Sequence, residues 1–263
     1  MDDDKFKKEI GDTIINKCIE ALGRIRAGIQ LLVEDDISFD AFCFMNRSMI
    51  LQRNIMNFSK KHGAGIECAF RDFVDPRNPS NNFGWRPFQI AFILMNLKGI
   101  VDPEHDNREV VDLLYFPTGG GKTEAYLGLM AFVIANRRLR ADENDEYNRD
   151  GGVTAILRYT LRLLTTQQRD RITKMILAAE LIRQKEYPKY GKEPISIGFW
   201  VGGTVTPNTF KELEEDPEDP AKTRTARSKK NSIYKQLLTC PFCGKPLTCL
   251  LYTSPSPRDK RQS

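Results

Sequence analysis

The sequence has few histidines, few tryptophans, little excess charge and no long apolar run. Its 263 residues include 2 His and 2 Trp, and the formal net charge is +5. No stretch approaches the roughly 18 consecutive apolar residues of a membrane-spanning helix, and the acidic start, Met1 to Asp4, is unlike a signal or transit peptide. We therefore expect a cytoplasmic protein with no membrane partner. The small net charge does not by itself indicate a nucleic-acid partner.

Cysteine is also sparse, and one pair alone is spaced like a binding site. Of the 6 cysteines, Cys18, Cys43 and Cys68 occur singly, as reduced and buried thiols do. Cys240 and Cys243 stand in the segment Cys-Pro-Phe-Cys-Gly-Lys-Pro-Leu, which predicts a zinc knuckle. This is half of a site, because structural zinc needs a complete tetrahedral set of ligands. A redox pair is disfavoured, since a charged linker and not a strand precedes it.

Helical periodicity dominates the first part of the chain. Apolar residues recur every three or four positions from Phe6 to Leu32, which predicts a long amphipathic helix. A second helix is predicted from about Phe39 to about Phe58. Residues 75–84 are mostly Asp, Asn, Pro, Ser and Gly, so they mark a boundary. We expect residues 1–75 to form a helical accessory region, in which His62 is an ordinary surface or capping residue.

The central motif is Phe116-Pro117-Thr118-Gly119-Gly120-Gly121-Lys122-Thr123. It follows an apolar stretch, 110–115, and precedes a helical pattern that reaches about Arg140. Glycines at this place allow backbone N–H groups to surround a phosphate, the helix N-terminus adds its positive dipole, and the lysine and threonine suit the outer phosphates and magnesium. The alternative is a structural glycine turn, which would gain nothing from the Lys-Thr pair. Phe116 departs from the usual pattern, which has glycine or alanine there.

Three apolar segments, 110–115, 153–157 and 195–201, alternate with helical patterns. This order predicts an α/β fold in which a parallel sheet carries helices on both faces. We expect this lobe to cover residues 76–210.

The segment Trp85-Arg86-Pro87-Phe88-Gln89 opens a helix about thirty residues before the glycine motif. A glutamine amide offers a donor and an acceptor, so Gln89 could pair with the edge of adenine while an aromatic ring stacks on the base. A capped surface helix is the alternative.

Beyond residue 210 the composition changes. Residues 211–232 hold an acidic block and then a basic block with almost no apolar side chains, which predicts a flexible linker. The basic block could contact phosphate or be solvated, and both alternatives stay open. Residues 233–248 carry the partial zinc knuckle. Residues 249–263 resemble a translated sequencing adapter, so we expect the natural chain to continue past Thr248 and the C-terminal end to be disordered from about Asp216.

Four segments, taken together, resemble the opening motifs of superfamily 2 helicases in order and spacing: Arg86–Gln89, Pro117–Thr123, Tyr159–Gln167 and Gly202-Gly203. Their amino-acid sequences are most similar to those of the helicase of the DISARM antiphage system. This resemblance implies an incomplete P-loop (RecA-like) first lobe, preceded by the helical region, of an ATP-dependent helicase that acts on DNA beside a DrmB-like partner.

The resemblance also implies roles for individual residues. Gln89 would read adenine, Thr118 to Gly121 would surround the phosphates with Glu124 nearby, Lys122 would hold the β- and γ-phosphates of ATP, and Thr123 would bind Mg²⁺. Five residues would contact the nucleic-acid backbone: Arg158, Thr160, Arg162, Gln167 and Gly203. Zinc would bind Cys240 and Cys243 in the full-length protein.

The sequence also departs from the helicase pattern. Nothing in it reads as the helicase Asp-Glu-x-His/Asp motif that completes the magnesium site, and no second lobe follows, so we expect nucleotide contact without turnover. Two other functions stay open. One is a P-loop ATPase that remodels proteins, against which residues 158–168 argue. The other is a non-catalytic assembly module, against which the intact Lys122 and Thr123 argue.

Overall fold

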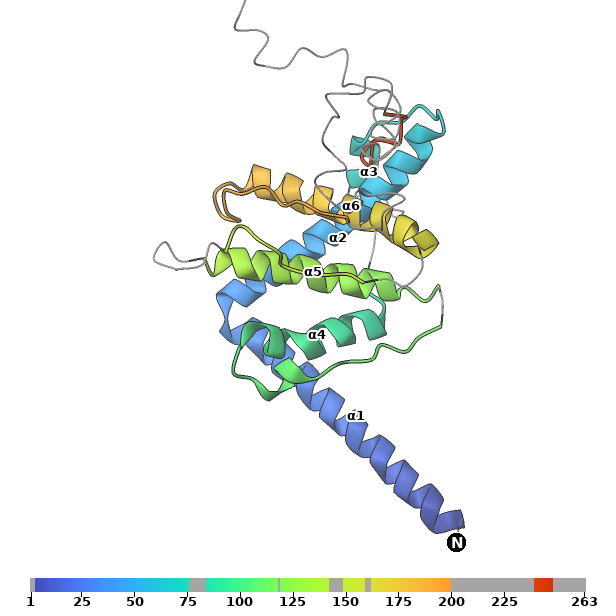
Figure 1. The fold of residues 1–263 in the computed structure, drawn as a ribbon, viewed down its shortest axis with the longest axis vertical. Coiled ribbons are helices and arrows are strands. Elements are labelled where there is room, and N and C mark those ends of the chain that lie inside the picture. The colour runs from blue at the N-terminus through green and yellow to red at the C-terminus, as the bar shows by residue number, and fades with distance from the viewer. Residues whose placement is uncertain are drawn as a thin grey trace, which may run out of the picture. The chain divides into compact units, whose positions relative to one another are not determined.

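The computed structural model describes residues 3–75, 84–117, 119–141, 149–158, 162–199 and 239–247. These residues are mainly helical (Figure 1). The elements are α1 (Asp3–Glu34), α2 (Asp36–Gly63), α3 (Arg71–Val74), α4 (Pro87–Val101), the short 3-10 helix η2 (Asp106–Glu109), α5 (Lys122–Leu139) and α6 (Arg162–Lys185). The helices expected from apolar periodicity are confirmed. None of the helices among the described residues is both long enough and apolar enough to cross a membrane.

The chain divides into two compact units. The first combines Met1–Gln52, Asn82–Leu157 and Met175–Ile195, and the second combines Arg53–Asn81, Arg158–Lys174 and Ser196–Ser263. Both units therefore draw on segments that are distant in sequence.

In the first unit, α4 packs between α1 and α5 (Figure 1). Gly28 allows the close approach of α1, because a Cβ atom there would lie 2.0 Å from the carbonyl oxygen of Leu94 on α4. Gly128 of α5 has the same role toward Trp85, whose ring would meet a Cβ at 2.6 Å. The buried apolar residues of this unit include Phe44, Met45, Ile93, Leu97, Leu127 and Phe132. Burial of such side chains is the main stabilising contribution.

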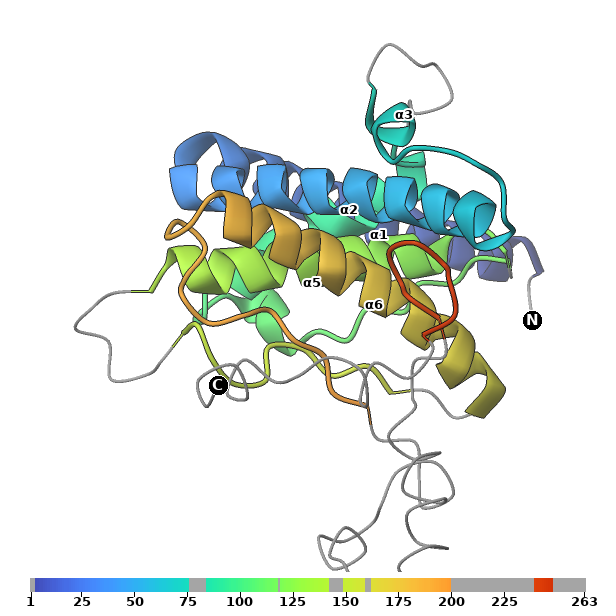
Figure 2. The same cartoon turned by 90° about the horizontal axis from the view of Figure 1, so that it is seen from above.

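The expected α/β fold with a parallel sheet is wrong. Across the described residues the one β-type pairing is the isolated bridge between Thr239 and Pro246, and neither view draws a strand arrow (Figures 1 and 2). Two of the three expected strands, 110–115 and 153–157, lack regular structure, and so does the described part of the third, 195–199.

The physical reason is the lack of a neighbouring strand for these segments among the described residues. Val111, Leu113 and Tyr115 are 93%, 88% and 89% exposed, and Ile156 is 84% exposed. A strand is stabilised by hydrogen bonds and side-chain contacts with a second strand at a distance of about 4.8 Å. An apolar run therefore shows a preference for extended backbone, whereas the pairing itself depends on residues elsewhere in the chain.

Candidate functional site

The glycine motif forms a tight loop directly before α5. Gly119 and Gly121 have φ values of +81° and +94°, which L side chains rarely adopt. The N–H of Gly120 donates to the carbonyl of Pro117 at 3.1 Å. Gly121 is the N-cap of α5 and provides no side-chain acceptor, so the N–H groups of the first helical turn are not capped by that residue. Such a helix start attracts anions.

Two positive side chains contact the loop. The Nζ of Lys122 donates to the carbonyl of Phe116 and lies 3.3 Å from that of Pro117. The Nη1 of Arg86, from the residue before α4, donates to the carbonyl of Gly120 at 2.8 Å. Both contacts are exposed to solvent. The loop therefore lies next to two positive side chains whose contacts with it are exposed.

Phe116, the residue that departs from the usual motif, supports the loop. Its ring stacks on that of Phe88, with the centroids 4.0 Å apart and the planes 15° apart. A Cβ atom at Gly120 would lie 2.9 Å from the Phe116 ring. Glycine at position 120 is therefore required by the aromatic side chain at position 116. Gly119 differs, since a Cβ there would meet no atom within 4 Å, and this side of the loop is open.

Gln89 lies beside the loop, and 3% of its surface is exposed. Its Oε1 accepts from the N–H of Arg86 at 2.8 Å, and its Nε2 donates to the carbonyl of Gly121 at 2.8 Å. The structure thus places Gln89 next to the glycine motif, and its role toward adenine stays a prediction. Trp85 packs on Gly128 of α5 and donates from its indole to Asn46 of α2 at 2.7 Å.

The other predicted site residues are only partly described. Thr123 and Glu124 lie half-buried in the first turn of α5. Arg158 is exposed at the end of the irregular segment 153–158. Arg162 and Gln167 belong to α6, but their side chains are outside the described set. Three further residues lie outside the described residues altogether: Thr118, Thr160 and Gly203.

In the second unit, residues 239–247 form the tight turn that the cysteine pair predicted. The N–H of Cys240 donates to Lys245, and that of Gly244 donates to Cys240, both at 2.8 Å. Burial opposes ionisation of the Cys240 thiol, but N–H groups of Cys243 and Phe242 and the Cys243 thiol lower its pKa below the usual value. This environment favours a thiolate, the form that binds metal. The described residues contain no group of three or more metal-binding side chains.

This turn packs against the C-terminal end of α2. The ring of Phe242 lies 5.4 Å from that of Phe58 and 4.9 Å from that of Phe70. The Nδ1 of His62 lies 2.8 Å from the carbonyl of Cys243, and a Cβ at Gly244 would lie 2.1 Å from the Ser59 carbonyl. The expected disorder from about Asp216 is therefore wrong for residues 239–247, which pack on this helix end. His62 is a docking residue, and the phenylalanines were the signal that sequence reasoning missed.

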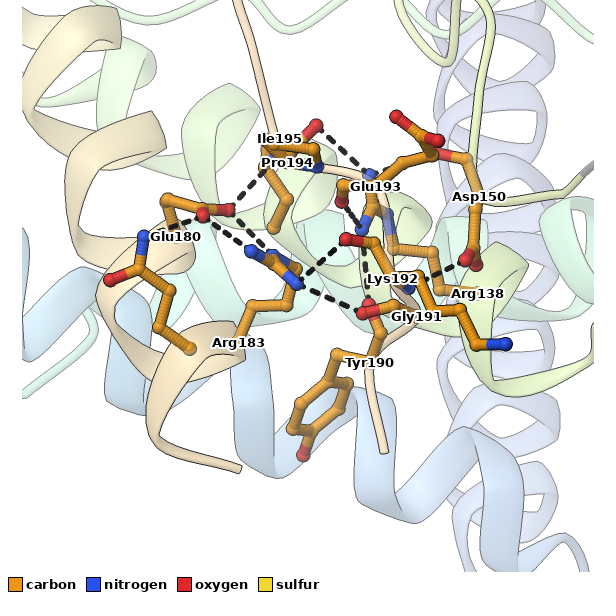
Figure 3. Close-up of polar contacts among 11 residues, drawn as sticks. Arg138, Asp150, Glu180, Arg183, Tyr190, Gly191, Lys192, Glu193, Pro194 and Ile195 are labelled. Carbon is orange, nitrogen blue, oxygen red and sulfur yellow. Dashed lines mark hydrogen bonds and ion pairs between the residues drawn. The ribbon is translucent and has the colours of Figure 1, made fainter. Parts of the chain in front are cut away.

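A second polar cluster lies at the other end of α5 (Figure 3). Arg138 is 8% exposed. Its guanidinium donates to four carbonyls, those of Asp150 at 2.9 Å, Tyr190 at 3.0 Å, Glu193 at 2.6 Å and Pro194 at 3.4 Å. Burial lowers the pKa of Arg138. Backbone carbonyls leave no pattern in a sequence, so the role of Arg138 could not be predicted.

Arg183 of α6 completes this cluster (Figure 3). It pairs with both carboxylate oxygens of Glu180, at 2.7 and 2.6 Å, and donates to the carbonyls of Gly191 and Lys192 at 3.0 and 3.2 Å. Glu180 also accepts from the N–H of Ile195 at 2.8 Å. Burial raises the pKa of Glu180, but the hydrogen bonds from Arg183, Ile195 and Gln184 outweigh burial and lower it to about 2. The cluster fixes the loop that follows α6.

The glycine loop, the start of α5 and the two positive side chains together form a candidate phosphate-binding loop. A scan against protein-family models finds no match. Comparison with known proteins nevertheless finds a particular relative. The chain is 47% identical over 240 residues to DISARM protein DrmA of Bacillus paralicheniformis. The aligned part covers 90% of this chain and 21% of that protein. The DrmA-like assignment is therefore confirmed, for a chain that spans about a fifth of the length of its relative.

Proposed function

We propose that the chain binds ATP with Mg²⁺ and is part of a DNA helicase or translocase of the DISARM antiphage system. The glycine loop carries this proposal, because it combines left-handed glycines, a helix N-terminus and two cations at one place. The likeness to DrmA supports the defence role. Helicase action, DNA and a DrmB-like partner would belong to the whole protein, of which this chain matches about a fifth.

The residues of the loop fit a nucleotide triphosphate. The open side of Gly119, where a Cβ would meet nothing within 4 Å, leaves room for phosphate oxygens. N–H groups of the loop and of the first turn of α5 would donate to these oxygens. Lys122 would exchange the carbonyls of Phe116 and Pro117 for the β- and γ-phosphates. The Thr123 hydroxyl would hold Mg²⁺, which when bound neutralises phosphate charge.

Contact with DNA is proposed through its phosphate backbone. The candidate residues Arg158, Thr160, Arg162, Gln167 and Gly203 offer guanidinium, hydroxyl, amide and backbone donors, which position a strand without reading its sequence. If DNA stimulates ATP hydrolysis by the full-length protein, the helicase proposal is supported over an ATPase that remodels proteins.

Nucleotide binding to the 263-residue chain tests the proposal. Titration with a fluorescent ATP analogue in the presence of Mg²⁺ should give saturable binding. We expect Lys122→Ala to weaken it by at least about tenfold, since a phosphate counter-charge is lost, without a change in the unfolding midpoint. Lys98→Ala is the matched control, because Lys98 lies on α4 and pairs with Asp102 at 3.9 Å. Unchanged affinity in Lys122→Ala would overturn the site.

A non-catalytic assembly module is the second candidate, and the docked knuckle favours it. Cys240 and Cys243 would provide two ligands of a zinc site in the full-length protein, held by Phe58 and Phe70 of the second unit. Metal analysis of the full-length protein and of its Cys240→Ser variant tests this role. Loss of one bound zinc in the variant is expected, and an equal zinc content in both proteins would exclude it.

A further inference from the structure

We propose that Gln89 is a positioning residue that orients the glycine loop, and that the loop binds triphosphates without preference for the base. This inference rests on the proposed function and changes the role expected for Gln89, from reading adenine to shaping the phosphate site.

The amide of Gln89 is engaged at both ends within the chain. Its Oε1 accepts from Arg86 N, and its Nε2 donates to the carbonyl of Gly121, each at 2.8 Å. The first bond satisfies the backbone N–H of Arg86, the N-cap residue of α4. The side chain is also buried, since 3% of the residue is exposed. Reading adenine would require the same amide to face the base with both its donor and its acceptor.

The bond to Gly121 has a direct consequence for the loop. Tyr187-Pro188 is the one cis peptide bond in the described residues, so the peptide between Gly121 and Lys122 is trans and planar. In such a peptide the C=O and the N–H point in opposite directions. Because Gln89 holds the carbonyl of Gly121, the N–H of Lys122 is directed away from Gln89.

Arg86 repeats this arrangement one residue earlier. Its guanidinium holds the carbonyl of Gly120 at 2.8 Å, so the N–H of Gly121 is directed away from Arg86 by the same peptide geometry. Two successive carbonyls are thus held by the start of α4, and two successive N–H groups are turned toward the opposite side. Successive backbone N–H groups with a common direction form an anion-binding concavity.

The space around Gly121 agrees with this role. A Cβ atom at Gly121 would lie 2.7 Å from the Nε2 of Gln89. The amide is therefore packed directly on the loop backbone. The neighbouring aromatic side chains are engaged as well, Trp85 with Gly128 and Asn46, and Phe88 with Phe116. The segment from Trp85 to Gln89 supports the loop through each of these contacts.

Competition binding to the 263-residue chain distinguishes positioning from base reading. The probes are ATP, GTP and inorganic tripolyphosphate, each with Mg²⁺. We expect the wild-type chain to bind ATP and GTP with similar affinity. Gln89→Ala should weaken all three probes by a similar factor of about ten, because the N–H groups lose their common orientation. Asn96→Ala is the matched control, since Asn96 is an α4 amide that bonds to the Phe92 carbonyl at 2.8 Å.

Hydrogen exchange gives a second readout that needs no ligand. In Gln89→Ala, the amide of Gly120, which donates to the carbonyl of Pro117 at 3.1 Å, should exchange faster than in the wild type because the loop loses its support, while amides in the middle of α5 keep their protection. Unchanged exchange of the Gly120 amide would overturn the positioning role, even if the variant bound nucleotide weakly.

The outcomes separate the two proposals. If Gln89→Ala weakens ATP alone and leaves GTP and tripolyphosphate unchanged, Gln89 reads the base; the positioning role is then overturned while the proposed function stands. If the wild-type chain binds none of the three probes, the proposed function is overturned, and this inference with it.

Discussion

The two ends of α5 show the same chemistry used in opposite ways. At each end a positive side chain donates to backbone carbonyls: Lys122 to those of Phe116 and Pro117 at the start, and Arg138 to four carbonyls at the end. The contacts of Lys122 are exposed, whereas Arg138 is 8% exposed. Similar contacts at the two ends of α5 therefore differ in whether solvent can reach them.

The helix dipole also distinguishes the positive side chains at the two ends of α5. A cation is stabilised at the C-terminal end of a helix and destabilised at the N-terminal end. Arg138, in the last turn of α5, agrees with this rule. Lys122 is the first residue of α5 and opposes it, next to a glycine N-cap that adds no side-chain acceptor. A lysine at this place does not help the helix, which supports the proposal that it faces an anionic ligand.

The largest effect is expected at the buried end. Arg138→Ala should lower the free energy of unfolding by about 3 kcal/mol, because the buried carbonyls that it contacts lose their donor. Denaturant unfolding measures this change. Lys122→Ala is the control from the exposed end and should cost less than about 0.5 kcal/mol. Equal losses in the two variants would contradict the contrast between the ends of α5.

The next effect is a pH dependence at the same cluster. The pKa of Glu180 is about 2 in the folded protein, below its ordinary value of 4.5. The unfolded chain therefore takes up a proton first, so the contribution of Glu180 is complete above about pH 4.5 and is lost as the pH falls through about 2. We expect Glu180→Gln to lower the free energy of unfolding by roughly 2 to 3 kcal/mol at pH 6 and to change it little near pH 2. A cost that is equal at both pH values would exclude this pairing.

A pair of glycines provides the most closely matched comparison. Gly119 and Gly191 have φ values of +81° and +80°, so alanine causes similar backbone strain of about 1 kcal/mol at either site. A Cβ at Gly191 would also lie 2.1 Å from the Asp150 carboxylate, whereas one at Gly119 meets nothing within 4 Å.

We therefore expect Gly191→Ala to lower the free energy of unfolding by about 2 kcal/mol and Gly119→Ala to lower it by about 1 kcal/mol. Thermal or denaturant unfolding measures both changes. In the nucleotide titration the order should reverse, because a methyl group at Gly119 would occupy space proposed for phosphate. Weaker nucleotide binding by Gly191→Ala than by Gly119→Ala would contradict the assignment of the two ends.

Local patterns explain which predictions succeeded. The helices follow from side chains three and four residues apart, and the turn of residues 239–247 follows from the spacing of Cys240 and Cys243 with a glycine after them. The glycine motif likewise predicted a loop before α5, and Gly119 and Gly121 have positive φ values, which glycine adopts at no steric cost.

The predicted sheet failed because strand pairing is not local. The run that contains Val111, Leu113 and Tyr115 has the apolar content of a buried strand, yet these side chains are exposed. The docking of Phe242 on Phe58 was missed for a related reason, since the two residues lie far apart in sequence and neither has a distinctive local pattern.

The sequence by itself determined the helices, the glycine motif and the likeness to DISARM protein DrmA, since each depends on residue types at short spacings. The tertiary structure alone decided which groups hold that loop and the loop after α6. Gln89 and Arg86 donate to the carbonyls of Gly121 and Gly120. Arg138 donates to those of Asp150, Tyr190, Glu193 and Pro194. Every residue has a backbone carbonyl, so only its position in the folded chain shows which one a side chain will bind.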